Sequence, residues 1–356
     1  MEQVLSGFRE RILAAASGAT PLCIRGGGSK DWYGQAPHGA ALETSAYNGI
    51  IEYEPTELVI TVRCGTPLAE IEAALAEQNQ MLAFEPPHFG ATATAGGMVA
   101  AGLSGPRRQA VGSLRDFVLG VVMMNGQGEV LHFGGQVMKN VAGYDVSRLL
   151  TGSLGTLGLL LEVSLKVLPR PFAETTVQLH MGQADAIRRV NTWGGQPLPV
   201  SASLWQDDVL TLRLSGAEAA VASARRLMGG DEVDGRQFWQ AAREHALDFF
   251  ADADAPATNP VWRLSVPSTA APLELPGPQL IEWSGAQRWL RSAAPAAQVR
   301  AAAAGAGGHA TLFRGGDKSA GVFHPLTAPV AAIHRNLKAG FDPQGIFNPG
   351  RLYPDL

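Results

Sequence analysis

The most constraining feature of this sequence is an apolar strand that runs directly into three glycines. Residues 21–25 (PLCIR) predict a short buried strand, and residues 26–30 (GGGSK) follow without a spacer. Successive glycines can turn several backbone N–H groups toward one anion, because glycine accepts positive φ and leaves room beside the chain. An isolated glycine triplet is more often a turn in a surface loop. The loop therefore predicts a ligand cradle only if other segments support it.

Further segments of the first 170 residues support it. Thr66-Pro67 predicts a helix that runs to about Gln78, with Thr66 as its N-cap and Pro67 at its first position. Residues 86–112 are poor in charge and rich in Gly, Ala and Thr, a composition that lets backbone approach something flat. Strands are predicted at 56–63, 116–125, 130–133 and 156–168, the middle two joined by a hairpin turn at 126–128.

The second half of the chain has a different pattern. Pro169-Arg170-Pro171 is the clearest linker. Strands and helices alternate beyond it, which favours an α+β domain with an antiparallel sheet. We expect strands at 175–180, 201–205 and 209–214 and helices at 184–193, 218–228 and 293–308. The predicted divisions are residues 1–170, 171–330 and a C-terminal segment, 331–356, that returns to the first domain.

Composition excludes several classes of partner. The net charge is −4, and no basic run is interleaved with aromatic residues, so nucleic acid is not an expected partner. No uninterrupted apolar stretch reaches the ~18 residues that a membrane span needs. Cys23 and Cys64 are too few for a disulfide framework or for an iron–sulfur cluster of their own. We expect a cytoplasmic protein that reaches a membrane only through partner subunits.

Familiar nucleotide and metal motifs are also missing. Neither residues 26–30 nor residues 152–158 fit the G-x-G-x-x-G pattern of nicotinamide-binding folds. The segment 315–319 (GGDKS) lacks the glycine-lysine order of a P-loop. No histidine pair has zinc spacing, so no metal site is predicted.

Several motifs together resemble one flavoprotein family. Residues 25–30 (RGGGSK), 93–102 (ATAGGMVAAG), 139–145 (KNVAGYD) and 152–158 (GSLGTLG) are similar, in order, to the FAD domain of the vanillyl-alcohol-oxidase/PCMH family. The closing segment 341–352 (FDPQGIFNPGRL) is similar to the end of that family's chains. The resemblance implies an α+β protein, with a PCMH-type FAD-binding domain of two α/β subdomains followed by a smaller α+β cap with an antiparallel sheet.

The resemblance also implies which residues hold FAD. The first loop would wrap the pyrophosphate. The small side chains around glycines 96, 97 and 102 would let the cofactor lie against the backbone. The flavin ring would be approached by residues 155–160, and Asn348 would return toward the cofactor. The implied cofactor-binding residues are Arg25, Gly26, Gly27, Gly28, Ser29, Lys30, Pro87, Gly90, Ala95, Gly96, Gly97, Ala100, Gly102, Gly155, Thr156, Gly158, Leu160 and Asn348. Covalently flavinylated relatives carry a histidine in the first loop, so Ser29 and Lys30 imply non-covalent FAD.

Catalytic residues are harder to assign. The resemblance places His88 near the flavin, and Arg314 could face a carboxylate with two parallel hydrogen bonds. His309 lies in a strand context, where a lone histidine is more often structural than catalytic. Lys139, Tyr144 and Asp145 fit a role in fixing the fold around FAD. Arg107-Arg108 would dock a partner or neutralise a phosphate.

The resemblance implies an FAD-containing subunit of a complex that oxidises a small 2-hydroxy acid, glycolate or D-lactate. The expected partners are a longer FAD subunit and an iron–sulfur subunit, because electrons on this flavin have no second carrier within the chain. Two roles stay open. The chain is a redox subunit that takes electrons from substrate, or a structural or relay subunit whose longer paralogue performs the chemistry.

Overall fold

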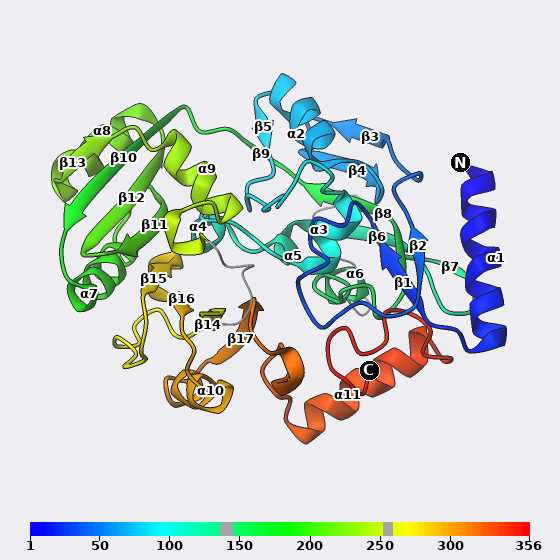
Figure 1. Ribbon diagram of the computed structural model, residues 1–356. Helices are drawn as coiled ribbons and strands as arrows, with labels where there is room; N and C mark the ends of the chain where they lie inside the picture. The colour runs from blue at the N-terminus through cyan, green and yellow to red at the C-terminus, as the bar shows by residue number, and fades with distance from the viewer. Residues whose placement is uncertain (136–144, 252–258) are drawn as a thin grey trace. The chain divides into compact units, whose positions relative to one another are not determined.

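The computed structural model describes residues 1–135, 145–251 and 259–356. Its contacts divide the chain into two compact units (Figure 1). Unit 1 contains Met1–Leu103, Ser113–Pro169 and Pro325–Leu356, and unit 2 contains Ser104–Gly112 and Arg170–His324. The sequence had placed the first boundary at residue 170 and the C-terminal return at residue 331. It did not foresee that Ser104–Gly112 packs with the second unit.

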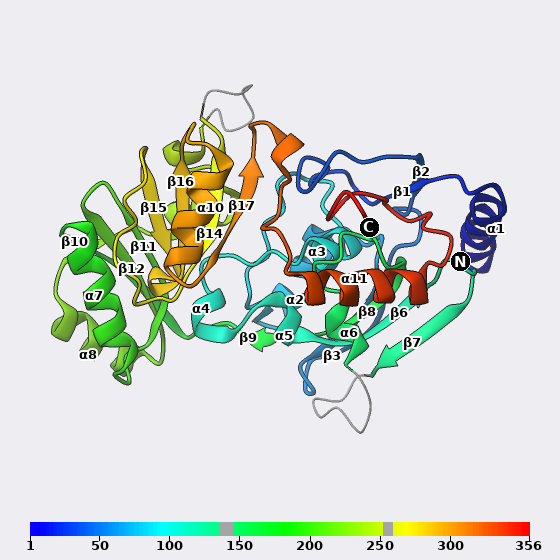
Figure 2. The ribbon, with the colours of Figure 1, turned by 90° about the horizontal axis from the view of Figure 1, so that it is seen from below.

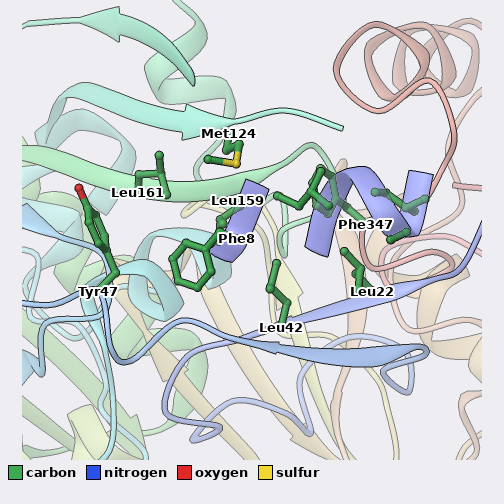
Figure 3. Close-up of a cluster of buried hydrophobic side chains, with 11 residues drawn as sticks. Phe8, Leu22, Leu42, Tyr47, Met124, Leu159, Leu161 and Phe347 are labelled. Atoms are coloured by element: carbon green, nitrogen blue, oxygen red, sulfur yellow. The ribbon is translucent and has the colours of Figure 1, made fainter. Parts of the chain in front are cut away.

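Unit 1 begins with a long helix and a small parallel sheet. Helix α1 (Glu2–Gly18) is followed by β1 (Leu22–Arg25) and β2 (Ala40–Glu43), which pair in parallel. Phe347, near the end of the chain, forms a parallel bridge to Leu22 beside β1. These elements share one apolar core that includes Phe8, Leu42 and Phe347, whose side chains converge in Figure 3. Burial of these large side chains ties both ends of the chain together.

A five-stranded antiparallel sheet forms the rest of unit 1, in the order β3-β4-β8-β6-β7. Strand β8 is buried along almost its whole length, which matches its unbroken apolar sequence. The strands are β3 (Ile50–Glu54), β4 (Val59–Arg63), β6 (Val118–Met124), β7 (Val130–Gly134) and β8 (Leu159–Lys166), and β5 (Gln80–Met81) pairs separately with β9 (Leu168–Pro169).

The helices of unit 1 are short except at its two ends. They are α2 (Leu68–Glu77), α3 (Ala95–Ala101), α5 (Leu114–Phe117), α6 (Val146–Leu149) and the C-terminal α11 (Ala328–Phe341). Helix α2 begins at Leu68, one residue later than predicted. The predicted N-cap was wrong because the Thr66 hydroxyl bonds elsewhere: it accepts from Gly49 N at 2.8 Å and donates to Arg63 O at 2.7 Å.

Unit 2 is built on one eight-stranded sheet in the order β13-β10-β12-β11-β15-β16-β14-β17, in which every pair is antiparallel (Figure 2). The predicted α+β cap with an antiparallel sheet is confirmed. Its strands are β10 (Ala173–His180), β11 (Val200–Gln206), β12 (Val209–Gly216), β13 (Asp231–Val233), β14 (Val261–Ser265), β15 (Gln279–Glu282), β16 (Gln287–Arg291) and β17 (His309–Arg314).

The α-helices in the described part of unit 2 are α4 (Arg108–Val111), α7 (Gln183–Gly194), α8 (Glu218–Met228), α9 (Arg236–Glu244) and α10 (Ala296–Gly305). Helices α7 and α8 bury their apolar faces in one cluster with β10 and β12. Helix α10, from the alanine-rich run, packs Val299 and Ala303 against β14, β16 and β17. Its apolar face explains why an alanine-rich segment forms an ordered helix.

The segment Ser104–Gly112 is an integral part of unit 2. Arg107 is buried, and its guanidinium lies 3.0 Å from a Glu174 carboxylate oxygen. Arg108 lies over the ring of Trp283, whose indole N–H donates to Gly105 O at 3.1 Å. The prediction that Arg107-Arg108 docks a partner or neutralises a phosphate was therefore wrong. Both side chains hold their own segment to the sheet of unit 2.

Candidate functional site

The first glycine loop of unit 1 presents a row of unused backbone donors. It leaves the end of β1, and Gly28 has φ +73°, a conformation that glycine adopts without steric cost. No described residue accepts a hydrogen bond from the N–H of Gly26, Gly27, Gly28 or Ser29. These residues are half-buried, and backbone N–H groups in such positions are nearly always paired. The loop therefore has the donors of an anion nest.

A second loop, residues 86–94, lies against the first. The Thr92 hydroxyl donates to Gly27 O at 2.6 Å, and Lys30 Nζ donates to His88 O at 3.0 Å. Among the residues that the structure describes, none accepts from the N–H of Gly90, Ala91 or Thr92 either. The two loops thus offer seven open amide donors close to one lysine side chain, a favourable setting for a diphosphate.

The glycines of the first loop are required by protein packing. A Cβ at Gly27 would overlap the carbonyl of Thr92, and a Cβ at Gly26 would overlap the Thr94 hydroxyl. A Cβ at Gly28 would lie 2.5 Å from a nitrogen of Arg25, whose guanidinium pairs with Asp31 at 2.7 Å. The glycines bring the loops together, and the open amides follow from that approach.

Helix α3 shows the same use of small residues. Thr94 caps it by accepting from Gly97 N at 3.2 Å, while Ala95 N and Gly96 N donate to Thr66 O and Cys64 O. Its first amides are therefore used within the protein. Gly96 packs against Cys64. The predicted roles of Ala95, Gly96 and Gly97 in binding the cofactor remain predictions, and their structural role is the tight seat of α3.

The third glycine segment packs on the far end of α3. Gly102 faces Gly152, and Gly152 N and Leu154 N donate to Val99 O and Ala100 O. The remaining predicted cofactor residues of this region lie in or near the same loop. The Thr156 hydroxyl donates to Ser153 O, and Gly155 lies beside the Asn348 amide. Gly158 contacts Met123, and Leu160 is buried in β8. In the second loop, Pro87 is buried.

The closing segment of the chain fastens the first loop. Asn348 accepts from Ile24 N at 2.8 Å and donates to Leu154 O at 2.6 Å, so its amide joins β1 to the third glycine segment. Arg351 donates to Asp31 O at 2.8 Å, just after the first loop. The Asn348 side chain therefore stabilises the start of the first loop through its amide oxygen and the third glycine segment through its amide nitrogen. This explains in physical terms why the closing motif occurs together with the glycine loop.

A buried ion pair anchors this closing segment, and the sequence analysis missed it. Lys338 Nζ lies 2.6 Å from Asp342 and also donates to Thr156 O and Phe347 O. Burial lowers the pKa of Lys338, and the carboxylate of Asp342 opposes that shift. The i, i+4 spacing of the two residues at the C-terminal end of helix α11 was the available signal.

The catalytic candidates belong to two units, and within unit 2 His309 and Arg314 lie apart. His88, in unit 1, points its Nε2 to within 3.3 Å of Glu72 on α2. His309 and Arg314 are the first and last residues of β17 in unit 2, about 17 Å apart at the rise of an extended strand. Burial, reinforced by Arg263 and His324, lowers the pKa of His309. Lys139 and Tyr144 lie outside the described residues, and Asp145 caps α6.

Unit 2 also contains His245, a half-buried histidine that the sequence did not single out. His245 stacks on Phe250 with 4.3 Å between ring centroids and also contacts Trp289 and Phe313. Burial, with the charges of Arg314 and Arg263, keeps its pKa well below the usual value. This aromatic setting is that of a neutral structural histidine.

The residues present fit FAD in unit 1. A dinucleotide needs amide donors for its diphosphate, and the two loops supply seven that no described residue uses. No group of three possible metal ligands occurs among the described residues. In those residues there is also no helix with the length and apolar character to cross a membrane.

Comparison with known proteins agrees with this geometry. The family described as "FAD binding domain" matches residues 9–134, which include both loops. Glycolate oxidase subunit GlcE of Escherichia coli K12 is 51% identical over 347 residues, covering 98% of this chain and 97% of that protein. The chain belongs to the GlcE family. The expected cofactor class, FAD, and the expected flavoprotein family are thereby confirmed.

Two further comparisons extend over a smaller share of the other protein. Glycolate oxidase subunit GlcD of Bacillus subtilis 168 is 32% identical over 180 residues, 49% of this chain but 38% of that protein. A solved structure of alkyldihydroxyacetonephosphate synthase superposes with a TM-score of 0.68 over 97% of this chain and 75% of its own, at 16% identity. That likeness shows that the two proteins share a fold.

Proposed function

We propose that this chain is the FAD-binding subunit of a glycolate oxidase complex. The observation that carries the proposal is the 51% identity to a glycolate oxidase subunit across nearly the full length of both chains. A likeness that continues through both units argues for the same role in a complex, beyond a shared FAD domain. The open amides of the two loops support a bound dinucleotide independently.

In this proposal the two loops of unit 1 perform the binding. The amides of residues 26–29 and 90–92 donate to the diphosphate, and the charge of Lys30 adds to the favourable field. Asn348 and Arg351 hold the first loop in place through its backbone. FAD, when bound, supplies a two-electron acceptor for the oxidation of a 2-hydroxy acid such as glycolate or D-lactate.

We expect the FAD to be held without a covalent bond. The first loop carries Ser29 and Lys30 where covalent relatives carry histidine, and the nearby His88 imidazole pairs with Glu72. Acid precipitation should release all flavin into the supernatant. Yellow colour that stays with the pellet would contradict non-covalent binding.

The proposed partners are a longer FAD subunit and an iron–sulfur subunit. Cys23 and Cys64 are both free thiols, and Cys64 is buried, so the chain cannot ligate a cluster that would carry electrons away. The GlcD relative, of which this chain covers 38%, is an example of a longer subunit. In this proposal the chain is cytoplasmic and approaches a membrane only through its partners.

A second candidate function is a non-catalytic structural or relay subunit, with chemistry in the longer FAD subunit. One observation favours it: within unit 2, His309 and Arg314 lie at opposite ends of one strand. Such separated groups do not supply a base and a carboxylate anchor at one substrate.

One pair of experiments separates the two functions. Glycolate added without oxygen to the purified, flavin-loaded chain should bleach the flavin absorbance if the chain is catalytic, and acetate, which lacks the hydroxyl, serves as control. Flavin that stays oxidised supports the relay or structural role. Co-expression with both partners, followed by dye-linked glycolate oxidation at matched flavin content, tests the complex. Full activity when this chain is omitted would overturn both functions.

A further inference from the structure

Two aromatic side chains lie beside the cradle, one from each of its loops. Trp32 follows the first loop, and Phe89 belongs to the second loop, directly before the open amide of Gly90. Their rings meet edge to face, with 5.2 Å between centroids and 69° between planes. Both residues are half-buried, so the pair lies at the surface of unit 1. The two loops that offer amides for a diphosphate therefore also offer an aromatic surface.

The Trp32 ring is held in place by the first loop. Its indole N–H donates to Ser29 O at 3.1 Å, and Ser29 is one of the residues with an open amide. The neighbouring Tyr33 is buried and contacts the same ring, with 5.9 Å between centroids. An indole fixed in this way can contact a ligand at a low cost in entropy, because few rotamers are left to lose on binding.

Phe89 has a backbone conformation that aromatic residues rarely adopt. Its φ is +53°, in the left-handed region where a side chain crowds the backbone. Glycine takes this conformation without that crowding. The fold alone would therefore favour glycine at position 89. An aromatic ring kept in this conformation indicates that the ring has a function, because strained residues collect at ligand clamps and active sites.

FAD carries adenine on one side of its diphosphate and the isoalloxazine on the other, and Lys30 distinguishes between them. The Lys30 ammonium lies 5.5 Å from the centre of the Phe89 ring and donates to His88 O at 3.0 Å. A cation is favourable beside the isoalloxazine, because that ring takes up electrons, and it has no comparable use beside adenine. The electron-rich indole of Trp32 also stacks well on the electron-poor isoalloxazine. The aromatic pair therefore fits the flavin end of the cofactor.

We propose that Trp32 and Phe89 form an aromatic wall against which the isoalloxazine of FAD packs. This inference rests on the proposed function, because it places the ring next to the amides of residues 26–29 and 90–92. Neither aromatic residue belongs to the motifs that predicted the cofactor. The wall adds ring contacts to a cradle that otherwise offers backbone amides and one lysine.

The first test compares FAD with ADP, which has the diphosphate and the adenine but no flavin. Calorimetric titration of the full-length apoprotein measures both affinities. Phe89→Gly removes the ring and relieves the backbone, so FAD should bind about tenfold more weakly, while ADP binding stays within about twofold of wild type. Phe172→Gly is the matched control, because Phe172 is 92% exposed in unit 2. It should leave both affinities unchanged.

Any result in which Phe89→Gly does not weaken FAD more than ADP overturns the aromatic wall. Equal weakening of both ligands would mean that the ring supports the loops, and a larger loss for ADP would assign the ring to adenine. Unchanged binding of both would mean that the ring contacts neither. The proposed function fails in a different way, because wild-type apoprotein would then bind neither FAD nor ADP.

The second test follows the fluorescence of bound FAD. An indole in contact with a flavin quenches its emission by electron transfer, and a phenyl ring does so far less. Trp32→Phe keeps an aromatic ring, so FAD affinity should stay within about threefold of wild type, while the emission per bound FAD rises several-fold.

Trp205→Phe is the matched control for this fluorescence measurement. Trp205 is also half-buried, and its indole N–H also donates to a backbone carbonyl, Met181 O at 2.9 Å, but it lies in unit 2. Its replacement should leave the emission of bound FAD unchanged. Unchanged emission in Trp32→Phe would separate the indole from the flavin ring and overturn the aromatic wall.

Discussion

The glycine loops of unit 1 and the buried Arg288 of unit 2 differ in how their hydrogen-bond donors are used. In the loops, seven backbone amides have no acceptor among the described residues. In unit 2, the buried Arg288 donates to Gly285 O, Ala270 O and Ala271 O. Burial lowers its pKa to about 10, and those carbonyls surround the charge that remains.

This difference separates a binding site from a scaffold. The amides of residues 26–29 are ordered and half-buried, and such donors without acceptors are costly unless a ligand supplies the acceptors. Fully used donors fix a structure and leave nothing for a ligand. By this criterion the two glycine loops of unit 1 form the candidate cofactor site, and Arg288 is a structural residue of unit 2. Four substitutions would break or sharpen the comparison.

The largest expected effect is that of Gly27→Ala. The added Cβ would overlap the Thr92 carbonyl, so the two loops must separate and the set of open amides is lost. We expect flavin retention to fall more than about 100-fold and unit 1 to lose about 1–3 kcal/mol from the forced shift. Flavin absorbance after gel filtration and thermal unfolding measure the two effects.

Gly7→Ala is the matched control, because its Cβ would meet no atom within 4 Å. It should keep its flavin and lose no stability. If Gly27→Ala kept its flavin, the cradle would have to lie elsewhere. The contact with Thr92 predicts that Gly27→Ala affects both cofactor binding and stability.

Glu174→Ala tests whether the polar clusters of unit 2 are structural. Glu174 lies 3.0 Å from Arg107 and 3.7 Å from Arg213, two arginines with side chains 8% and 5% exposed. Removing a partner from buried charges costs about 3–5 kcal/mol, but Glu174 is itself 40% exposed, so we expect about 2 kcal/mol. Denaturant unfolding should show this loss with flavin content unchanged. A parallel loss of flavin would give unit 2 a part in binding.

Much of this architecture could be predicted from sequence because local patterns determine it. The helix at 218–228 was predicted with its observed bounds, since its apolar spacing and the glycine that follows it are both local signals. The strands at 209–216 and 173–180 were found within two residues, because alternation and buried apolar runs identify them. The flavoprotein family followed from several motifs in a fixed order.

Long-range partners could not be predicted in this way. Arg107 appeared to be a surface residue because its partner Glu174 is 67 positions away and nothing local marks the pair. Asn348 was expected to reach toward the cofactor, but its amide bridges Ile24 and Leu154, more than 190 positions away. Such contacts are set by tertiary packing, which one sequence does not reveal.

Asn348→Ala should weaken FAD binding indirectly, because Asn348 holds the backbone next to the first glycine loop. The change leaves Ile24 N and Leu154 O without their side-chain partner, and an unpaired buried polar group costs about 1–3 kcal/mol. We expect FAD to bind about tenfold more weakly while the chain stays folded, as measured by titration of apoprotein with FAD. Asn336→Ala, an exposed change on α11, is the control. Unchanged affinity would make the closing segment irrelevant to the cofactor.

The smallest expected effect is a dependence of unit 2 on pH. Burial among Phe250, Trp289 and Phe313, with Arg314 and Arg263 nearby, holds the pKa of His245 well below 6.5. At pH values between the lowered pKa of the folded chain and about 6.5, His245 is therefore protonated in the unfolded chain and neutral in the folded chain. Stability of unit 2 should fall as pH drops through that window, by up to about 1.4 kcal/mol per pH unit.

His245→Asn should flatten this dependence. Asparagine tolerates the left-handed backbone that His245 adopts at φ +52°, and it does not titrate. The variant loses ring stacking and so should be less stable at pH 7.5, but the stability difference from wild type should shrink as pH falls toward 5. Denaturant unfolding at several pH values measures both curves, with His180→Asn on an exposed strand end as control. Parallel curves for wild type and His245→Asn would assign the acid sensitivity to other groups.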